Sequence, residues 1–492
     1  MRRTYVTPWR LGFTAAALAA ALVAAACSEP PTTGSGNAVA IGPGGQLPDC
    51  PLDALDEATG PVEVSLWYGG LVGSTKATME DIVARFNASQ DQVRVTANDQ
   101  GASYEEIYRK YQSASATPEQ LPDLIYLEDT QLQAMIDGGQ VLPAQACMEA
   151  AGYDLTNIES AARSTYTVGD VLYPGYMNVS TPVLYYNKAH WVKAGLDPNK
   201  PPQTLDEIYT QAKALKDAGV SEKPLSFRVS RWFFETWLTG IGENIVNNGD
   251  GRQAPATKAT FATPEADDLV GWLKKMNDDG LLNAFANTEG SIDQYLALAT
   301  QQSSMLIETS AASSTIADAL GGNVTAAEAG IDFDASVLDK AQLVPGAAAM
   351  PGIEAPGKVF PTGGAFYILN TSEPAQQAGS WKFLEYMLRP EIGKIWHLNG
   401  GYLPIVKAVE DDPEVQAFWK DQLAGVLLKP AVDQLASADP DRPGPLIGPY
   451  VDEALAIENA LDAVLFENQN VPESLARAQD EVTQSLERYA GG

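Results

Sequence analysis

The chain has 492 residues, which is enough for about two to four domains or one large two-lobed body. Hydrophobic residues make up 45% of it and charged residues 19%, a balance typical of globular proteins with large cores. The formal net charge of -31 predicts a surface that repels nucleic acid and anionic lipid, so we expect no nucleic-acid partner. The two histidines and three cysteines show no metal-ligand spacing, and we expect neither a metal nor a cofactor.

Residues 1–26 have the pattern of a secretory signal peptide. Arginines within the first ten residues precede the apolar run 11–26, and small residues lead to Cys27. A transmembrane anchor is the alternative, but this run is short for a membrane span. The stretch AAAC resembles a bacterial lipobox that lacks the usual leucine three places before the cysteine. It predicts that Cys27 is lipidated and holds the protein on the outer face of the cell membrane.

A flexible tether and a disulfide are expected after the cleavage site. Residues 27–49 are rich in Pro, Gly, Ser and Thr, which is typical of a linker without fixed structure. Cys50 and Cys147 are the two remaining cysteines. Because exported proteins form disulfides readily, we predict a Cys50–Cys147 disulfide, with two free thiols as the alternative.

The first part of the folded chain predicts a mainly parallel sheet. Alternating residues predict strands at 62–68 and 93–97, and the apolar run 121–127 predicts a third strand that is buried on both faces. Helical spacing of apolar residues predicts helices over 75–87 and 104–115. Alternating strands and helices form right-handed βαβ units, so the three strands should run parallel.

Polar and aromatic side chains follow the predicted strands. Tyr68 ends the first strand, Tyr104 lies beyond the second, and Glu128 and Asp129 follow the third. In parallel sheets, ligands bind beyond the carboxyl ends of the strands, so these side chains are candidates for a binding site. The alternatives are structural: an ordinary core aromatic for Tyr68, and a helix cap for Asp129.

The remainder of the chain is rich in predicted helices. Thr204 is a predicted N-cap of a helix that extends to about residue 218, and residues 269–276 form another amphipathic helix. Short strands are predicted at 303–308 and 359–369, the second with a Gly-Gly bend. The chain from Val451 onward reads as helix, break and helix.

Four motifs carry a family resemblance. They are STPVLYYNK at 180–188 with its continuation, the strand that ends at Glu128-Asp129, TGGAF at 362–366, and WHLNGGYLPI at 396–405. Together they resemble the extracellular solute-binding proteins (family 1) of ATP-driven ABC importers, especially the sn-glycerol-3-phosphate-binding branch. The resemblance covers nearly all of the chain from Val62 onward.

The resemblance implies an α/β, two-lobed periplasmic-binding-protein-like fold (type II), with mixed sheets flanked by helices and lobes joined by crossing hinge segments. Lobe 1 would comprise residues 50–180 plus 366–405, and lobe 2 residues 181–365 plus 406–492. A small-molecule ligand in the cleft would favour the closed form, because that form makes both sets of contacts. The implied partners are ABC permease subunits in the membrane, and we expect a monomer.

The resemblance also implies particular ligand contacts. The matching positions are Tyr104, Glu128, Asp129, Ser180, Ser310, either Gly363 or Gly364, Tyr402 and Arg442, and Tyr68 and Trp232 are further aromatic candidates. Carboxylates would accept hydrogen bonds from ligand hydroxyls, a glycine amide would approach an anion, and arginine would pair with phosphate.

One position departs from the pattern. Leu205 stands where the enterobacterial glycerol-3-phosphate binders carry an aromatic residue. The loss of a flat ring would enlarge the cleft for a glycerophosphodiester such as glycerophosphocholine, or would favour a sugar.

The motif residues also have structural interpretations, and an enzyme is the hypothesis from another class. Gly363-Gly364 could be only a bend, His397 a structural histidine, and the aromatic group after Arg231 core. Paired carboxylates occur in glycosidases, but we expect Glu128 and Asp129, as neighbours on a strand, to point to opposite faces. No nucleophile elbow or P-loop occurs in the sequence, so we predict no catalysis.

Overall fold

The computed structural model describes residues 46–101, 103–288, 291–321 and 344–491. The predicted signal peptide, Cys27 and most of the predicted tether lie outside these residues. Among the described helices, none combines the length and apolar character that a membrane crossing requires. Within the same ranges, no group of three or more His, Cys, Asp and Glu side chains is arranged to hold a metal ion.

The first sheet has the strand order β2-β1-β3-β13-β4, with β7 paired to β13. Its strands are β1 (Val62–Tyr68), β2 (Val93–Asp99), β3 (Leu124–Glu128), β4 (Val141–Leu142), β7 (Tyr176–Met177) and β13 (Gly364–Leu369). β1 is parallel to β2 and β3, whereas β13 is antiparallel to β3. The predicted parallel strands are therefore confirmed, and a strand from late in the chain makes the sheet mixed.

The second sheet has the order β10-β9-β11-β8-β12. Its strands are β8 (Pro182–Asn187), β9 (Leu225–Arg228), β10 (Leu282–Phe285), β11 (Met305–Thr309) and β12 (Pro345–Ala349). β9 is parallel to β10 and β11, and β8 is antiparallel to β11 and β12. A small separate sheet pairs β5 (Thr167–Val168) with β6 (Val171–Leu172).

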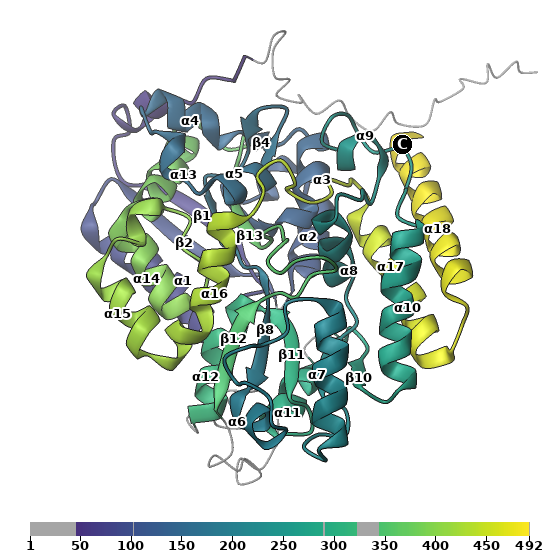
Figure 1. The fold of residues 1–492 in the computed structure, drawn as a ribbon. Helices are drawn as coiled ribbons and strands as arrows, with labels where there is room; N and C mark the ends of the chain where they lie inside the picture. Colours follow the sequence, from purple (N-terminus) through teal and green to yellow (C-terminus); the bar gives the residue numbers. More distant parts are fainter. Residues whose placement is uncertain (1–45, 102, 289–290, 322–343, 492) are drawn as a thin grey trace, which may run out of the picture. The chain divides into compact units, whose positions relative to one another are not determined.

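Eighteen α-helices surround these sheets in the part of the chain that the structure describes. They are α1 (Gly73–Ser89), α2 (Tyr104–Ala114), α3 (Leu132–Asp137), α4 (Ala144–Ala150), α5 (Ser160–Thr165), α6 (Lys188–Lys193), α7 (Leu205–Asp217), α8 (Arg231–Gly240), α9 (Asn247–Asp250), α10 (Pro264–Asp278), α11 (Asp293–Ala299), α12 (Ser313–Gly321), α13 (Pro374–Met387), α14 (Pro390–Gly400), α15 (Pro413–Asp421), α16 (Leu423–Ser437), α17 (Tyr450–Glu467) and α18 (Val471–Gly491). Helices α1 and α13 pack against the first sheet and α10 and α11 against the second, while α17 and α18 pack on each other (Figure 1).

Two crossing segments run side by side and connect the two sheets. One leads from β7 to β8 and the other from β12 to β13. They meet at Ser180 and Thr362, whose backbone groups exchange hydrogen bonds of 2.9 and 3.1 Å. Leu403 bridges Val179 next to this contact, so a third segment joins the crossing.

Strand β8, from the motif STPVLYYNK, belongs to two cores at once. Its residues are all buried, and they alternate between two hydrophobic clusters. Val183 and Tyr185 belong to the cluster around the first sheet, and Leu184 and Tyr186 to the cluster around the second. Successive side chains of a strand point to opposite faces, and here each face meets a different core.

The two clusters do not follow chain order. The buried residues of α15 and α16 belong to the first cluster, and those of α17 and α18 to the second. The assignment of residues 406–492 as a whole to one lobe remains a prediction.

Local patterns predicted most of these elements, with differences at strand ends. Thr204 caps α7 by accepting a hydrogen bond from the Glu207 amide, as expected. The predicted helix, break and helix from Val451 onward are confirmed as α17 and α18. The predicted strand 359–369 is wrong in its first half, since β13 begins at Gly364 and residues 359–363 form the crossing segment.

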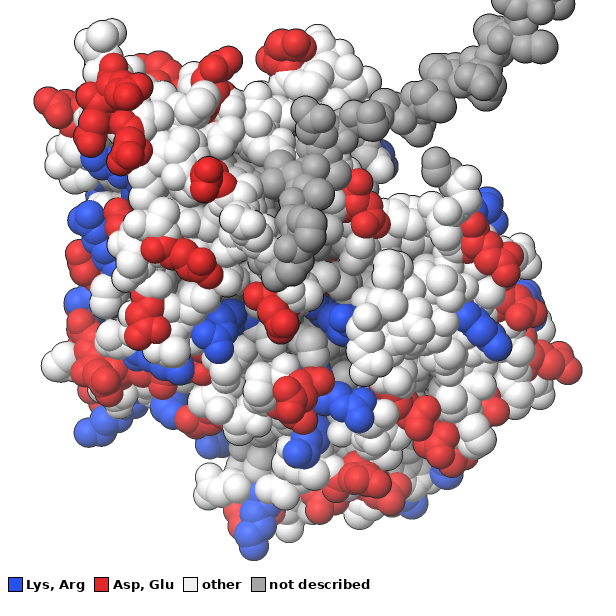
Figure 2. Space-filling model, turned by 90° about the horizontal axis from the view of Figure 1, so that it is seen from above, with Lys and Arg blue, Asp and Glu red and all other residues white. Residues whose placement is uncertain are grey.

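Acidic side chains are spread over the face seen in Figure 2, with basic side chains between them. This agrees with the excess of Asp and Glu in the composition.

The predicted disulfide is confirmed. Cys50 and Cys147 are bonded across a sequence separation of 97 residues, and Cys147 is fully buried in the first core. The bond ties the start of the folded chain to α4.

Replacing both cysteines with alanine should lower the free energy of unfolding by about 2–5 kcal/mol, because a long loop would no longer be closed in the unfolded chain. Urea unfolding would measure this change. Reducing agent should produce the same loss in the wild-type protein and none in the double variant; a reducing agent that leaves wild-type stability unchanged would contradict the expectation.

Candidate functional site

A cavity of about 300 Å³ lies where elements of both sheets meet the crossing segments. Strands β3, β9 and β11 all end at this cavity, with Glu128, Arg228 and Thr309 as their last residues. The carboxyl ends of strands therefore supply its walls, as expected for open α/β sheets. Its lining residues are Tyr104, Glu105, Glu128, Asp129, Thr130, Ser180, Arg228, Ser230, Arg231, Trp232, Asn287, Thr309, Ala311, Thr362, Gly363, Tyr402 and Glu458.

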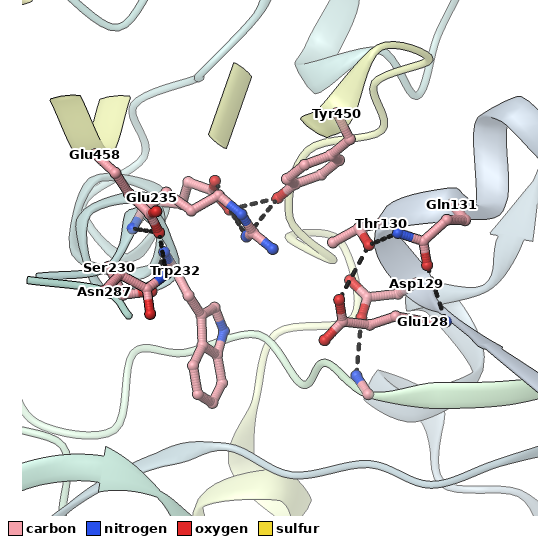
Figure 3. A network of polar contacts seen from close by, with 12 residues as sticks. Glu128, Asp129, Thr130, Gln131, Ser230, Trp232, Glu235, Asn287, Tyr450 and Glu458 are labelled. Carbon is pink, nitrogen blue, oxygen red and sulfur yellow. Dashed lines mark hydrogen bonds and ion pairs between the residues drawn. The ribbon is translucent and has the colours of Figure 1, made fainter. Parts of the chain in front are cut away.

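The carboxyl pair Glu128 and Asp129 forms one wall (Figure 3). β3 ends at Glu128 and turns directly into a 3-10 helix, η3 (Asp129–Gln131), so both carboxyl groups reach the same cavity. The expectation that they point to opposite faces is therefore wrong, because the strand does not continue past Glu128. Glu128, rather than Asp129, caps η3, in a reciprocal arrangement with Gln131.

Both carboxyl groups hold protons more tightly than usual. Burial raises the pKa of Glu128 to about 8, and the neighbouring charge of Asp129 adds to the rise. Burial also raises the pKa of Asp129 to about 6, while the Gly363 amide and the Arg231 charge oppose that shift. Asp129 is thus the carboxylate and Glu128 the carboxylic acid at neutral pH.

Gly363 holds Asp129 in place. Its amide donates to Asp129 Oδ1 at 2.8 Å, and its carbonyl accepts from the Asp129 amide at 3.0 Å. The Tyr166 hydroxyl also donates to this carbonyl, at 2.5 Å. Gly363 has φ +147°, and a Cβ there would lie 1.9 Å from the Asn178 carbonyl oxygen, so a side chain does not fit. The anion that the glycine amide approaches is the protein's own carboxylate.

Arginine side chains and an indole form the opposite wall. Arg228 donates to Asn287 at 2.8 Å and pairs with Glu308 at 3.2 Å, and its Nε has no partner among the described residues. Ser230 caps α8 by accepting from the Trp232 amide. In Figure 3 the Trp232 indole projects from α8, and its Nε1 likewise lacks a hydrogen-bond partner in the described part of the chain.

Arg231, the first residue of α8, is held by buried groups behind the cavity wall. Its Nη1 lies 3.4 Å from both oxygens of Glu235 and donates to the Tyr450 hydroxyl at 3.2 Å. The guanidinium also lies over the Tyr450 ring, 4.5 Å from its centroid. The side chain is 16% exposed, so its charge acts on the cavity with little screening.

Tyrosines form a third part of the lining. The Tyr104 and Tyr126 hydroxyls lie 3.1 Å apart, and Asn178 donates to Tyr126 at 2.7 Å. Burial raises the pKa of Tyr104 and of Tyr402, so both hydroxyls remain neutral. They are hydrogen-bonding groups for a ligand rather than charges.

The structure gathers seven of the predicted site residues around this cavity. They are Tyr104, Glu128, Asp129, Ser180, Trp232, Gly363 and Tyr402. The Ser180 hydroxyl forms no hydrogen bond with the described residues. That these seven residues contact a ligand remains a prediction.

Five other predicted residues do not line the cavity. Tyr68 is buried and donates to Glu80 at 2.9 Å, and Leu205 belongs to the second core. Ser310 is fully buried, and its hydroxyl accepts from the Thr181 amide at 3.1 Å. Gly364 begins β13, where a Cβ would meet the ring of Tyr126 at 2.1 Å. Arg442 lines a separate cavity of about 850 Å³.

Sequence reasoning missed several cavity residues. Arg228, Arg231, Asn287, Thr309 and Glu458 line the cavity, and none of them was predicted. The available signal was Ser230, a residue type that commonly caps helices, directly before Arg231. The interpretation of His397 as structural is confirmed: its Nδ1 lies 2.7 Å from the Tyr402 carbonyl and its Nε2 accepts from Trp419 at 2.8 Å.

This geometry defines a two-lobed solute-binding protein, with a polar cavity between two α/β sheets and crossing segments at its base. A family profile described as "Bacterial extracellular solute-binding protein" matches residues 81–422. The chain belongs to this family.

Curated relatives include the sn-glycerol-3-phosphate-binding periplasmic protein UgpB. The Shigella dysenteriae protein is 23% identical over 378 residues, covering 75% of this chain and 80% of that protein. The Escherichia coli K12 protein is 24% identical over 383 residues with the same coverage.

Solved structures share the fold. UgpB from Mycobacterium tuberculosis in complex with glycerophosphocholine has a TM-score of 0.68 at 19% identity and covers 88% of this chain and 100% of its own. The GacH receptor of Streptomyces glaucescens, solved unliganded and with acarbose, has a TM-score of 0.67 at 19% identity and covers 87% and 99%. The expected two-lobed, periplasmic-binding-protein-like fold is thereby confirmed.

Replacing Gly363 with alanine should destabilise the protein by about 1–3 kcal/mol. The new Cβ would collide with the Asn178 carbonyl oxygen, and alanine disfavours the positive φ of this position. Urea unfolding would measure the loss. Gly60→Ala is a matched control, since a Cβ there meets nothing within 4 Å. Equal stabilities of the two variants would contradict the assigned role of Gly363.

Acid should lower the stability of the folded protein through His397. Burial lowers the pKa of His397 to about 4, whereas an unfolded histidine titrates near ~6.5. As the pH falls from 6.5 toward 4, the unfolded chain takes up a proton that the folded chain does not, which costs about 1.4 kcal/mol of stability per pH unit.

The stability difference between wild type and His397→Gln should therefore shrink by about 2 kcal/mol between pH 7 and pH 5. Urea unfolding at both pH values would measure it, and the carboxyl groups common to both proteins cancel. A difference that stays constant would show that His397 titrates normally.

Proposed function

We propose that this protein captures a small polar solute for an ABC importer, and that the solute is a glycerol phosphate compound, with a glycerophosphodiester such as glycerophosphocholine favoured. The observation that carries the proposal is a single cavity with a carboxyl pair on one wall and arginines with an indole on the other. A dipolar ligand can place hydroxyls or a cation at Glu128 and Asp129, and a phosphate toward Arg228 and Arg231. The printed names of the UgpB relatives support the same ligand class.

The charge of the cavity favours a phosphodiester over glycerol-3-phosphate. Carboxyl groups at four lining positions outnumber the two arginines, and each arginine is already paired with a buried glutamate. A phosphomonoester carries about -1.5 to -2 charges at neutral pH. A phosphodiester with a quaternary ammonium group has no net charge, and its cation can lie against an aromatic ring such as that of Trp232.

A sugar is the second candidate. The free Ser180 hydroxyl, the free Trp232 indole N–H and the Asp129 carboxylate suit the mixed donors and acceptors of a carbohydrate. Small-molecule sites are typically lined by aromatic rings together with a few polar groups that orient the ligand. The GacH structure contains acarbose, which supports this candidate at the level of the fold.

Capture would follow from lobe closure. A ligand that contacts both walls favours the form in which they are close, and the crossing at Ser180 and Thr362 is the proposed hinge. The proposal includes lipidation of Cys27, a monomeric state, permease subunits as partners and no catalytic activity.

Thermal unfolding with a ligand panel tests the proposal. The panel comprises glycerol-3-phosphate, glycerophosphocholine, maltose, trehalose and monosaccharides. A ligand at about 100 times its Kd should add about 2.7 kcal/mol of stability. Stabilisation by sugars alone would reject the glycerol phosphate ligand and keep the family assignment.

If glycerophosphocholine binds through its cation, its affinity should rise as the pH increases through about 8, because Glu128 then becomes negatively charged. Glu128→Gln should remove this rise. Calorimetry between pH 7 and 9 would measure both, with glycerol-3-phosphate as the comparison ligand. An affinity that does not change with pH in the wild-type protein would show that the cation binds away from Glu128.

A further inference from the structure

Glu453, on α17, is a carboxyl group buried behind the cavity wall. Its side chain is 0% exposed, and neither carboxyl oxygen has a hydrogen-bond partner among the residues that the structure describes. An ionised carboxylate at such a position would lose its hydration without compensation, whereas a neutral acid loses much less. The surroundings therefore favour a bound proton on Glu453.

Glu235, on α8, already balances the nearest cation. It is also 0% exposed, accepts from the Tyr450 hydroxyl at 2.6 Å and lies 3.4 Å from Arg231 Nη1. One guanidinium and two carboxyl groups in a dry region leave one negative charge in excess unless a proton is held. In agreement, burial, the charge of Glu235 and the closeness of its carboxyl group raise the pKa of Glu453, while the Arg231 charge opposes the rise.

The other groups packed against α17 do not supply a second cation to Glu453. On the same helix, Glu458 adds negative charge. Across the contact with η3, Asp129 is a further carboxyl group near Tyr450. On α18, Arg488 lies 3.9 Å from Asp452. On α10, Lys274 pairs with Asp278 and Lys275 with Asp279. The buried Arg252 donates to the carbonyls of Thr165, Pro443 and Gly444.

The position of Arg231 depends on this arrangement. Arg231 lines the cavity and interacts electrostatically with three buried or half-buried carboxyl groups. Glu235 and Glu453 lie behind it, and Glu128 lies across the cavity. While Glu453 is neutral, Glu235 alone attracts the guanidinium from behind. An ionised Glu453 would add a second attraction and draw the guanidinium away from the cavity.

We propose that Glu453 is held as a neutral carboxylic acid and acts as a positioning residue, whose bound proton keeps the Arg231 guanidinium at the cavity wall. The proton stays on Glu453 and is transferred to no ligand.

Two spectroscopic measurements on the full folded protein test this role without a bound solute. Infrared difference spectra between wild type and Glu453→Gln at pH 7 should show the loss of one carboxylic-acid C=O band per chain. The Nε–H resonance of Arg231, assigned by comparison with Arg231→Lys, should shift in the wild-type protein as the pH rises from 6 to 10. In Glu453→Gln the shift should be clearly smaller, because only Glu128 across the cavity then gains a charge in this pH range, while glutamine at 453 has the same shape and no charge to gain.

Glu467→Gln is the matched control, since Glu467 is an exposed carboxylate at the end of the same helix. This variant should retain both the acid band and the Arg231 shift. A difference spectrum between wild type and Glu453→Gln without the acid band would overturn the bound proton, since the acid band of Glu128 is common to both proteins and cancels. An Arg231 resonance that does not move in the wild-type protein, or that moves equally in Glu453→Gln, would overturn the positioning role. Because neither readout uses a solute, failure here is separate from failure of the proposed ligand.

Discussion

The reciprocal contact between Gly363 and Asp129 is the constraint on which the cavity depends. It joins a crossing segment to the carboxyl end of β3 through three backbone groups and one carboxylate oxygen. A side chain at Gly363 would displace the segment from Asn178, and with it the paired segment at Ser180. The acid pair, the hinge and the base of the cavity are therefore positioned by the same few atoms.

The second organising feature is an excess of buried carboxyl groups around a few arginines. Glu308 is fully buried against Arg228, and Glu235 and Glu453 lie fully buried near Arg231. Removing charges from water is costly, so such clusters persist only when cations, hydrogen bonds or bound protons compensate. The arrangement leaves arginines at the cavity whose charge is largely neutralised by buried carboxylates. Such arginines suit the proposed ligand, which has no strong net negative charge.

The fold could be predicted in large part because its signals are local. The alternation in residues 62–68 and the helical spacing after it need only neighbours in sequence, and both elements formed as expected. The first half of the predicted strand 359–369 failed because Gly363 takes a positive φ to meet Asp129, and no pattern within that stretch contains its partner. Likewise, Ser310 resembled a ligand-binding serine, and its hydroxyl accepts a hydrogen bond from the amide of Thr181, in the crossing segment just before β8.

The sequence by itself indicated the family, through four motifs that resemble it, and the two cysteines left for a disulfide. It also determined the strands and helices of residues 62–128 and the acid pair at the end of β3, since these depend on short spacing. The tertiary structure decided which polar residues share one cavity. Arg228, Arg231 and Glu458 face Glu128 because two sheets meet there, although about a hundred residues or more of chain separate them from it. Their charges act through space, and burial rather than residue type sets which carboxyl groups keep a proton.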